Sequence, residues 1–336
     1  MAKASGYLKG FVKLKWKPAA HARGYAMYRD GKRVSTAGPR ATRTRFYLQP
    51  GDHDISVVTL PGTATTPQSS SLRVGVNANV AQGGTTMKKD VLALGTSIIR
   101  EDRGNYAIPF ATTHGISDDC VIWLDPGSKG AGCPIVELDN EPYYDNWDNL
   151  GGVAQWAQKA RDVAKQVHAA HPHARILLPS LAVTNNGDVQ ENGDWTPMLG
   201  AIDKAAPDIW KYVDGIAIHP YTAGSAPAKT FSGMDHLRGQ LRAIGGRAAT
   251  LPFWITEVGW PTAGAASVTE QQQAAFLAQL IDGAKARGDV AAVFIYRLQD
   301  LSEQTDNREF WFGLLRANGT KKPSWTTVKQ LIAAGD

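Results

Sequence analysis

The chain has 336 residues, of which 43% are hydrophobic and 20% charged, and its formal net charge is +5. This composition is typical of a soluble globular protein, and the length exceeds that of one ordinary domain, so we expect a large domain and a small one. No stretch is apolar for long enough to predict a membrane span, and the N-terminus lacks the apolar core of a signal peptide.

Positive charge is concentrated near the N-terminus. Residues 1–70 contain twelve Lys and Arg against three Asp, a net charge of +9, which leaves −4 for the rest of the chain. The stretch "PGTATTPQSSS" (61–71) then predicts a boundary between domains 1–70 and 71–336. The basic domain could attract an anionic surface such as a cell-wall polymer, or its charge could simply keep it soluble. It carries no signature of a specific nucleic-acid binder.

Short strands are predicted in this first domain. "FVKLKWK" (11–17) alternates apolar residues with Lys, and "GYAMYRDGKRV" (24–34) places Asp30-Gly31 between two apolar runs, which is a hairpin signal. Two further strands flank Pro50-Gly51. Over about 65 residues the segment resembles a fibronectin type III module, through Trp16, "GYAMYRDGK" and "LQPGDHDISV". The resemblance implies a small β-sandwich that positions or binds other molecules.

Beyond residue 71 the pattern changes to strand followed by helix. Eight apolar strands are predicted, at 73–78, 96–102, 120–126, 134–140, 175–181, 214–221, 252–260 and 291–300. Amphipathic helices lie between several of them: "LGGVAQWAQKARDVAKQVHAAH" (150–171) has one apolar face, and Thr269 with Gln272 has the spacing of a capping box. Parallel strands alternating with helices over about 265 residues predict an α/β fold, the (β/α)8 TIM barrel.

Polar residues end several of these strands. Glu141 follows "PIVELDN", Glu257 ends "PFWITE", and Arg100, His219 with Tyr221, and Tyr296 have the same position on their own strands. Active sites of such barrels lie at the C-terminal ends of the strands. We therefore expect these side chains to meet at one face of the barrel.

The same residues carry a second resemblance. "LDNEP" on the fourth strand and "ITEVGWP" on the seventh look like the two signatures of clan A glycoside hydrolases, and "VGVNA", "ALGTSIIRED", "HPY" and "FGLLRANGTKKPSW" are further matches, the last similar to family 39 and its relatives. The resemblance implies a retaining hydrolase of β-linked glycans, with Glu141 as acid/base and Glu257 as nucleophile. Strand eight departs from the pattern, because "FIYRLQD" lacks the Trp that many members have there.

This chemistry needs two carboxyl groups about 5 to 5.5 Å apart, one to protonate the leaving oxygen and one to attack the anomeric carbon. Arg100, His219 or Tyr221 could hold Glu257 ionised, and the charge of Glu257 would favour a protonated Glu141. Asn140 is expected to contact the sugar 2-hydroxyl. Trp260 and Tyr296 complete the expected substrate-binding set; no metal or other cofactor is expected.

Other interpretations compete with these. His219 could be a core histidine, Trp260 could be packing rather than a surface on which a sugar stacks, and "HAAHPH" (168–173) could suggest a metal site but more simply ends a surface helix. The whole chain could also be a non-catalytic carbohydrate-binding or structural protein, for instance part of a phage particle or cell-surface assembly, that retains a hydrolase barrel.

Two cysteines flank a short connection. With Cys120 opening the third strand and Cys133 just before the fourth, only residues 127–133 would join these strands, so we expect no helix between them. Neighbouring strands are about 4.8 Å apart, which suits a Cys120–Cys133 disulfide, with two buried thiols as the alternative. A disulfide agrees with an extracellular or virion-associated protein, and the short connection favours an open cleft.

Overall fold

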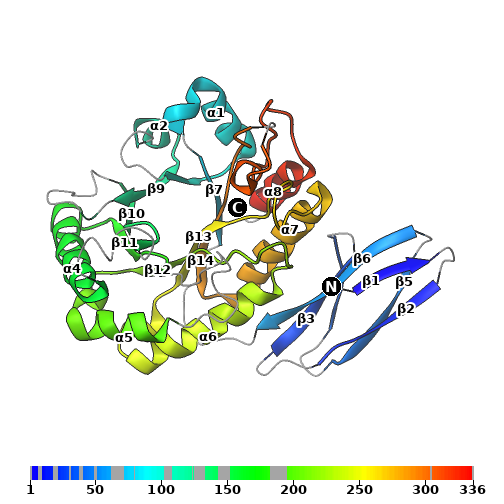
Figure 1. Cartoon of the computed structure of the whole chain (residues 1–336), viewed down its shortest axis with the longest axis horizontal. Helices are drawn as coiled ribbons and strands as arrows, with labels where there is room; N and C mark the ends of the chain where they lie inside the picture. Colours follow the sequence, from blue (N-terminus) through cyan, green and yellow to red (C-terminus); the bar gives the residue numbers. More distant parts are fainter. Residues whose placement is uncertain are drawn as a thin grey trace.

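The computed structural model describes residues 2–6, 10–17, 22–29, 32–37, 41–48, 51–61, 72–78, 80–101, 108–122, 124, 133–142, 152–181, 195–302 and 305–334. Figure 1 shows a ring of strands surrounded by helices, with a small group of antiparallel strands beside α7. In this part of the chain, none of the helices has the length and apolar character needed to cross a membrane.

The N-terminal strands form two antiparallel sheets, β1-β6-β3-β4 and β2-β5. Their bounds are β1 Ala2–Gly6, β2 Gly10–Lys15, β3 Ala22–Arg29, β4 Lys32–Ala37, β5 Arg43–Leu48 and β6 Gly51–Pro61. β3 and β4 pair antiparallel on either side of Asp30-Gly31, which confirms the hairpin. Tyr25 and Met27 are buried, and the Trp16 and Tyr25 rings lie 5.1 Å apart. The domain boundary, the fibronectin type III resemblance and the anionic partner stay predictions.

The second part of the chain is an eight-stranded closed barrel of parallel strands, as the sequence predicts. Its strands are β7 Arg73–Asn77, β8 Ile98–Glu101, β9 Ser117–Ile122, β10 Ile135–Leu138, β11 Arg175–Leu178, β12 Gly215–Ile218, β13 Phe253–Val258 and β14 Val290–Ile295. The helices are α1 Val80–Leu94, α2 Ile108–Thr113, α4 Val153–Ala170, α5 Thr196–Ala205, α6 Ala228–Ile244, α7 Glu270–Arg287 and α8 Pro323–Ala333, with short helical turns η2 Ile209–Lys211, η3 Ala248–Thr250 and η4 Arg308–Phe310.

Alternation along the strands produces two apolar layers. One set of side chains fills the barrel interior, namely Ile98, Ile135, Leu177, Ala217, Trp254, Ala292 and Phe294. Their strand neighbours, such as Ile99, Val136 and Ile216, join the larger cluster that includes the helices. Trp254 can fill the interior because Gly215 lies alongside it, where a Cβ would collide with the indole ring. The packed interior leaves the strand ends as the place where polar groups meet.

Both predicted helical features are present. α4 buries Trp156, Ala160, Val163, Ala164 and Val167, which lie on the face expected from the sequence. α7 begins with the expected capping box, since the Thr269 hydroxyl accepts from the Gln272 backbone N–H and the Gln272 side chain accepts from the Thr269 N–H. Local sequence therefore determines the buried face of α4 and the N-terminal end of α7.

The third strand begins earlier than expected. β9 starts at Ser117 and ends at Ile122, so Cys120 lies within the strand and does not open it. The expectation was wrong because Asp118 and Asp119 look like loop residues, yet both are buried in the strand. Twelve residues, not seven, then separate β9 from β10. The predicted absence of a helix and the open cleft concern residues that lie mostly outside the described ones.

Cys120 and Cys133 form a disulfide in the structure, with their Cα atoms 6.1 Å apart. Cys120 pairs in register with Val136, so the bridge crosses diagonally from β9 to the residue that precedes Pro134 and β10. Both cysteines are buried. The bridge therefore lies beside the middle of β9, not at the N-terminal rim where the sequence had placed it.

Candidate active site

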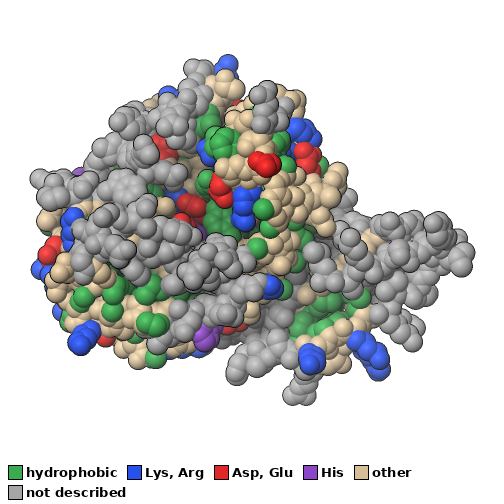
Figure 2. Space-filling view, in the orientation of Figure 1, with side chains coloured by type: hydrophobic (Ala, Val, Ile, Leu, Met, Phe, Trp, Pro, Cys, Tyr) green, Lys and Arg blue, Asp and Glu red, His purple; other side chains and the backbone are tan. Residues whose placement is uncertain are grey.

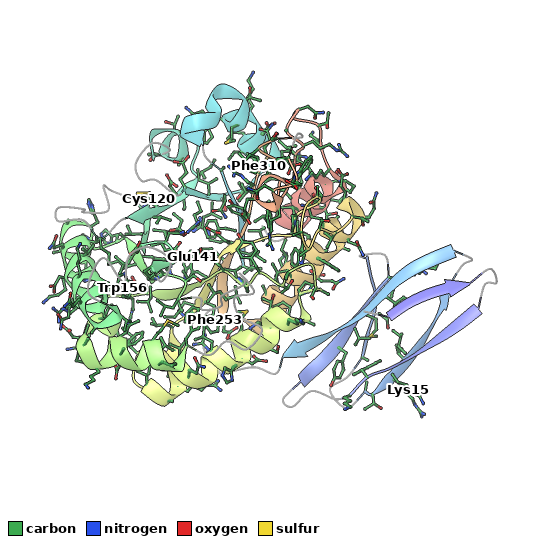
Figure 3. The ribbon with its side chains drawn as sticks, viewed as in Figure 1. Lys15, Cys120, Glu141, Trp156, Phe253 and Phe310 are labelled. Atoms are coloured by element: carbon green, nitrogen blue, oxygen red, sulfur yellow. A yellow bond between two sulfur atoms is a disulfide. The ribbon has the colours of Figure 1, made fainter. Side chains whose placement is uncertain are left out.

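The C-terminal ends of the strands bring together most of the polar residues expected there. Figure 3 shows Glu141 near the middle of the ring of strands, and Figure 2 shows acidic and basic side chains together in a hollow of the same face. Glu257 is the fifth residue of β13, while Glu141 follows β10 by three residues. A carboxylate oxygen of each, together with a ring nitrogen of His219, lies within 4.8 Å of the others.

Arg100 is the hub of the site. Its side chain, completely buried on β8, donates hydrogen bonds to Glu137 Oε2 (2.8 Å), Asn77 Oδ1 (3.0 Å), Glu257 Oε1 (2.7 Å) and Asn140 Oδ1 (2.8 Å). These acceptors come from β7, β10, β13 and the turn after β10. A guanidinium with its donors fixed in a plane can hold four such groups in a set geometry.

Glu257 is held from two sides. Arg100 donates to Oε1, and the Tyr221 hydroxyl donates to Oε2 at 2.8 Å. Burial, and then the charge of Glu257, raises the pKa of Tyr221 well above its ordinary value, so the phenol keeps its proton and stays a donor. The two donors stabilise the ionised carboxylate and fix the direction in which its oxygens point.

Glu141 is bonded to His219. The His219 Nδ1 atom lies 2.6 Å from Glu141 Oε1, and its Nε2 atom lies 2.9 Å from the Thr256 hydroxyl. Burial alone would lower the pKa of His219, but the charges of Glu257 and Glu141 outweigh it, and the pKa is raised. His219 is thus neither a solvated residue nor a histidine buried among apolar groups, because one ring nitrogen contacts an expected catalytic carboxyl group.

The turn that carries Glu141 has an unusual backbone. Asp139 and Glu141 have positive φ angles of 74° and 44°, a backbone conformation that residues other than glycine rarely adopt. The buried Asp139 carboxylate compensates, because it accepts from the Asn140 backbone N–H (2.9 Å) and from the Trp156 indole N–H on α4 (3.0 Å). The hydrogen bond from α4 thereby holds the turn in place. The strained backbone conformation includes Glu141 itself, whose side chain must point toward His219 and Glu257.

Trp260 does not have the place expected for a sugar platform. It is 1% exposed, its ring packs edge-on against Phe276, and its indole N–H donates to Ser225 O at 2.8 Å. A ring enclosed in this way has no face for a sugar, so the packing interpretation is correct for Trp260. Tyr296 is partly buried at the end of β14, and its ring lies 6.1 Å from that of Tyr221.

Sequence reasoning missed four residues of this network. Glu137, Thr256, Asn77 and Asp139 all contact the expected site residues, and each is buried. One signal was present: Glu137 is a charged residue inside the apolar run "PIVELDN", and such a residue needs a partner within the fold. The partners, Arg100 and Thr256, are 37 and 119 residues away in the chain.

Glu141, His219 and Glu257 are also the one group in the described residues whose ligand atoms are close enough to hold a metal ion. Those atoms already bond to one another or to Arg100 and Tyr221. A cation would compete with the Arg100 guanidinium for Glu257. The arrangement therefore suits proton transfer and nucleophilic attack better than metal binding.

Solved structures of glycoside hydrolases share this fold. The chain resembles, over 98% of its length and 78% of the other, a family 39 glycoside hydrolase from Bacteroides cellulosilyticus WH2 (TM-score 0.58, 17% identity). It also resembles a family 128 endo-β-1,3-glucanase from Amycolatopsis mediterranei, solved with laminaripentaose, with a TM-score of 0.52 and 17% identity over 76% of this chain and 98% of that one. A third similar structure is xylanase 10B from Thermotoga maritima, with a TM-score of 0.51 and 14% identity over 79% of this chain and 95% of that one. At these identities the likeness shows the fold alone.

No curated protein matches the chain. A family model does: the one described as "Glycosyl hydrolase catalytic core" matches residues 140–323. This range is more than half of the chain, and it contains Asn140, Glu141, His219, Tyr221 and Glu257. The barrel, the paired carboxyl groups at its C-terminal face and this match together show that the chain belongs to the glycosyl hydrolase catalytic core family.

Proposed function

We propose that the protein is a retaining glycoside hydrolase that cleaves a β-linked glycan. The observation that carries the proposal is the pair Glu141 and Glu257, of which two carboxylate oxygens lie within 4.8 Å of each other. Retaining enzymes have their carboxyl groups about 5 to 5.5 Å apart, whereas inverting enzymes need about 6.5 to 9.5 Å to leave room for a water molecule. The spacing here suits direct attack by one carboxylate.

Glu257 is the proposed nucleophile. Its carboxylate accepts hydrogen bonds from Arg100 and Tyr221, which fix its position. In the first step a Glu257 oxygen bonds to the anomeric carbon as the bond from that carbon to the leaving oxygen breaks, and Glu141 gives its proton to the leaving oxygen. In the second step Glu141 takes a proton from water, whose oxygen replaces Glu257 on the same carbon.

Glu141 is the proposed acid/base, and His219 is its proton partner. The 2.6 Å contact between His219 Nδ1 and Glu141 Oε1 is a hydrogen bond along which a proton can pass between the two groups. Glu141 must be protonated in the first step and ionised in the second. A positive charge on His219, whose pKa is raised, stabilises the ionised Glu141 that the second step needs.

Asn140 is proposed to bind the sugar 2-hydroxyl. Its Oδ1 atom accepts from Arg100, which directs the amide N–H groups away from the guanidinium. No other described residue accepts from this amide. It is therefore available as a donor to the substrate, and such a bond strengthens as the oxocarbenium-like transition state forms.

The experiment is a screen of aryl β-glycosides and β-linked polysaccharides with the wild-type protein and three variants. Glu257→Ala should lose nearly all activity and regain part of it with azide, giving the inverted glycosyl azide. Glu141→Ala should retain far more activity on aryl glycosides with good leaving groups than on natural glycans. Asp162→Asn, on the exposed side of α4, is the matched control. Glycan binding without turnover by the wild-type chain would instead favour a carbohydrate-binding protein.

A further inference from the structure

A second group of charged side chains lies beside the proposed catalytic pair. Arg297 directly follows Tyr296 at the end of β14, and Arg308 begins the short turn η4. The guanidinium carbon of Arg297 lies 5.6 Å from the centre of the Tyr296 ring, and that of Arg308 lies 5.5 Å from the centre of the Phe312 ring. Neither arginine belongs to the hydrogen-bonded network around Arg100.

Three aromatic rings connect these arginines to the nucleophile. The Tyr221, Tyr296 and Phe312 rings contact one another edge to face, with centres 5.4 to 6.1 Å apart. Tyr221 donates to Glu257 from the same cluster. Each arginine therefore contacts a ring of the aromatic cluster from which Tyr221 reaches the proposed nucleophile.

Arg308 and Glu309 are neighbours in η4, with the Arg308 Nε atom 3.4 Å from Glu309 Oε1. The Glu309 side chain is exposed, and its pKa is raised by desolvation and by the charges of Glu257 and Glu141, against the opposing effect of Arg308 and Arg297. Arg297 and Arg308 therefore bring two positive charges to this side of the barrel face, against one negative charge from Glu309.

The donors of Arg297 are unused. Within the described part of the chain, no residue accepts a hydrogen bond from its guanidinium or forms an ion pair with it, although the side chain is partly buried. Arg308 is only loosely engaged: its Nε atom lies 3.4 Å from Glu309 Oε1, and that buried Nε atom has no hydrogen-bond partner. Of these donors only Arg308 Nε is buried, and those of Arg297 are open to solvent, so both arginines can still take an acceptor that a ligand supplies.

We propose that Arg297, assisted by Arg308, binds the carboxylate of an acidic sugar, so that the substrate is a β-linked glycan containing uronic acid units. This inference rests on the proposed function and adds the class of sugar. A bound sugar displaces water from a partly buried guanidinium, and neutral hydroxyl groups replace its hydrogen bonds without balancing its charge. A carboxylate does both, and its two oxygens match the guanidinium fork.

The test measures binding of matched small glycosides to the full chain by calorimetry. The probes are the methyl β-glycosides of glucuronic, galacturonic and mannuronic acid, each beside its neutral parent, with glucose 6-sulfate as a tetrahedral anion. We expect at least one uronide to bind about tenfold or more tightly than its neutral parent, the scale of a hydrogen bond to a charged group, and more tightly than the sulfate. Arg297→Gln should remove this preference, and Arg297→Lys should retain only part of it.

Arg161→Gln is the matched control, since it removes a partly exposed arginine of α4 that pairs with Asp162 and Asp208. Equal binding of each uronide and its neutral parent, or a preference that survives Arg297→Gln, would overturn the inference, and so would tighter binding of the sulfate. If these results came with hydrolysis of neutral glycans that depends on Glu141 and Glu257, the proposed function would stand and only the inference about an acidic sugar would be contradicted. Uronide binding that depends on Arg297, without hydrolysis of any glycan, would support the acidic-sugar inference and contradict the proposed function.

Discussion

The Thr256 hydroxyl and the His219 Nε2 atom are joined by a hydrogen bond of 2.9 Å. The same hydroxyl lies 3.3 Å from Glu137 Oε1, to which it donates its single proton. It must then accept from His219, so the Nε2 atom carries a proton. The Nδ1 atom is left to share a proton with Glu141. Glu137 and Thr256 thereby keep a proton on Nε2 of the histidine that contacts the proposed acid/base, Glu141.

Thr256→Val should disturb this arrangement with little change of volume. The Nε2–H group would lose its acceptor, and a buried unsatisfied donor costs about 1 to 3 kcal/mol. His219 would then hold its proton on Nδ1, from which it donates to Glu141, and this favours an ionised Glu141. We expect kcat/KM at neutral pH to fall about tenfold and the alkaline limb of its pH profile to move to lower pH.

Thr256→Ser is the control for this prediction, because it keeps the hydroxyl and loses only a methyl group. It should retain the wild-type pH profile. A uniform loss of activity in Thr256→Val at every pH, with an unmoved alkaline limb, would assign Thr256 to packing instead.

The site illustrates which functional residues a sequence can reveal. Glu141 and Glu257 follow apolar strands in recognisable motifs, and the strand-end rule placed Arg100, His219 and Tyr221 on the same face. The barrel itself followed from eight apolar runs alternating with helices. These inferences depend only on local pattern and on the fact that parallel strand ends converge, so they did not require knowledge of any contact.

The network behind Glu141 depends on contacts across the barrel. Nothing in the sequence around Thr256 distinguishes it from any other strand residue until Glu137 and His219 are placed beside it. For Trp260 the sequence suggested a sugar-binding role, whereas the structure shows a buried side chain. An aromatic residue that follows a strand can pack inside the fold or face the substrate, and the local sequence does not distinguish the two. The "DD" of Asp118 and Asp119 also looked like a loop, although tertiary burial includes both residues in β9.

Asp118 makes the stability of the protein depend on pH. It is 1% exposed, its carboxyl oxygens have no hydrogen-bond partner, and burial, followed by the charge of Glu101, raises its pKa to about 7. The unfolded chain releases this proton near pH 4, while the folded protein retains it. The free energy of unfolding should therefore fall as pH rises from about 4 to about 7, by up to about 4 kcal/mol from this group.

Asp118→Asn replaces the carboxyl group by a neutral group of the same shape. We expect the variant to lose much of the fall in stability between pH 5 and pH 8 that the wild-type protein shows, as measured by urea unfolding at both values. Asp162→Asn, which alters an exposed carboxyl group on α4, should keep the wild-type dependence. The same pH dependence in Asp118→Asn and the wild type would contradict the role of Asp118.

The Cys120–Cys133 bridge should contribute to stability through the chain segment that it closes. The two residues are 13 positions apart, and a closed loop of this length is worth about 3 kcal/mol in the unfolded chain. Because both cysteines are buried, reductant should reach them only when the barrel opens. We expect no free thiol in the unfolded, unreduced protein, and a lower urea midpoint after reduction in denaturant and refolding. Cys120→Ser with Cys133→Ser should show that lower midpoint without reductant and no further change with it, whereas two thiols in the unreduced chain would mean that the bridge does not form.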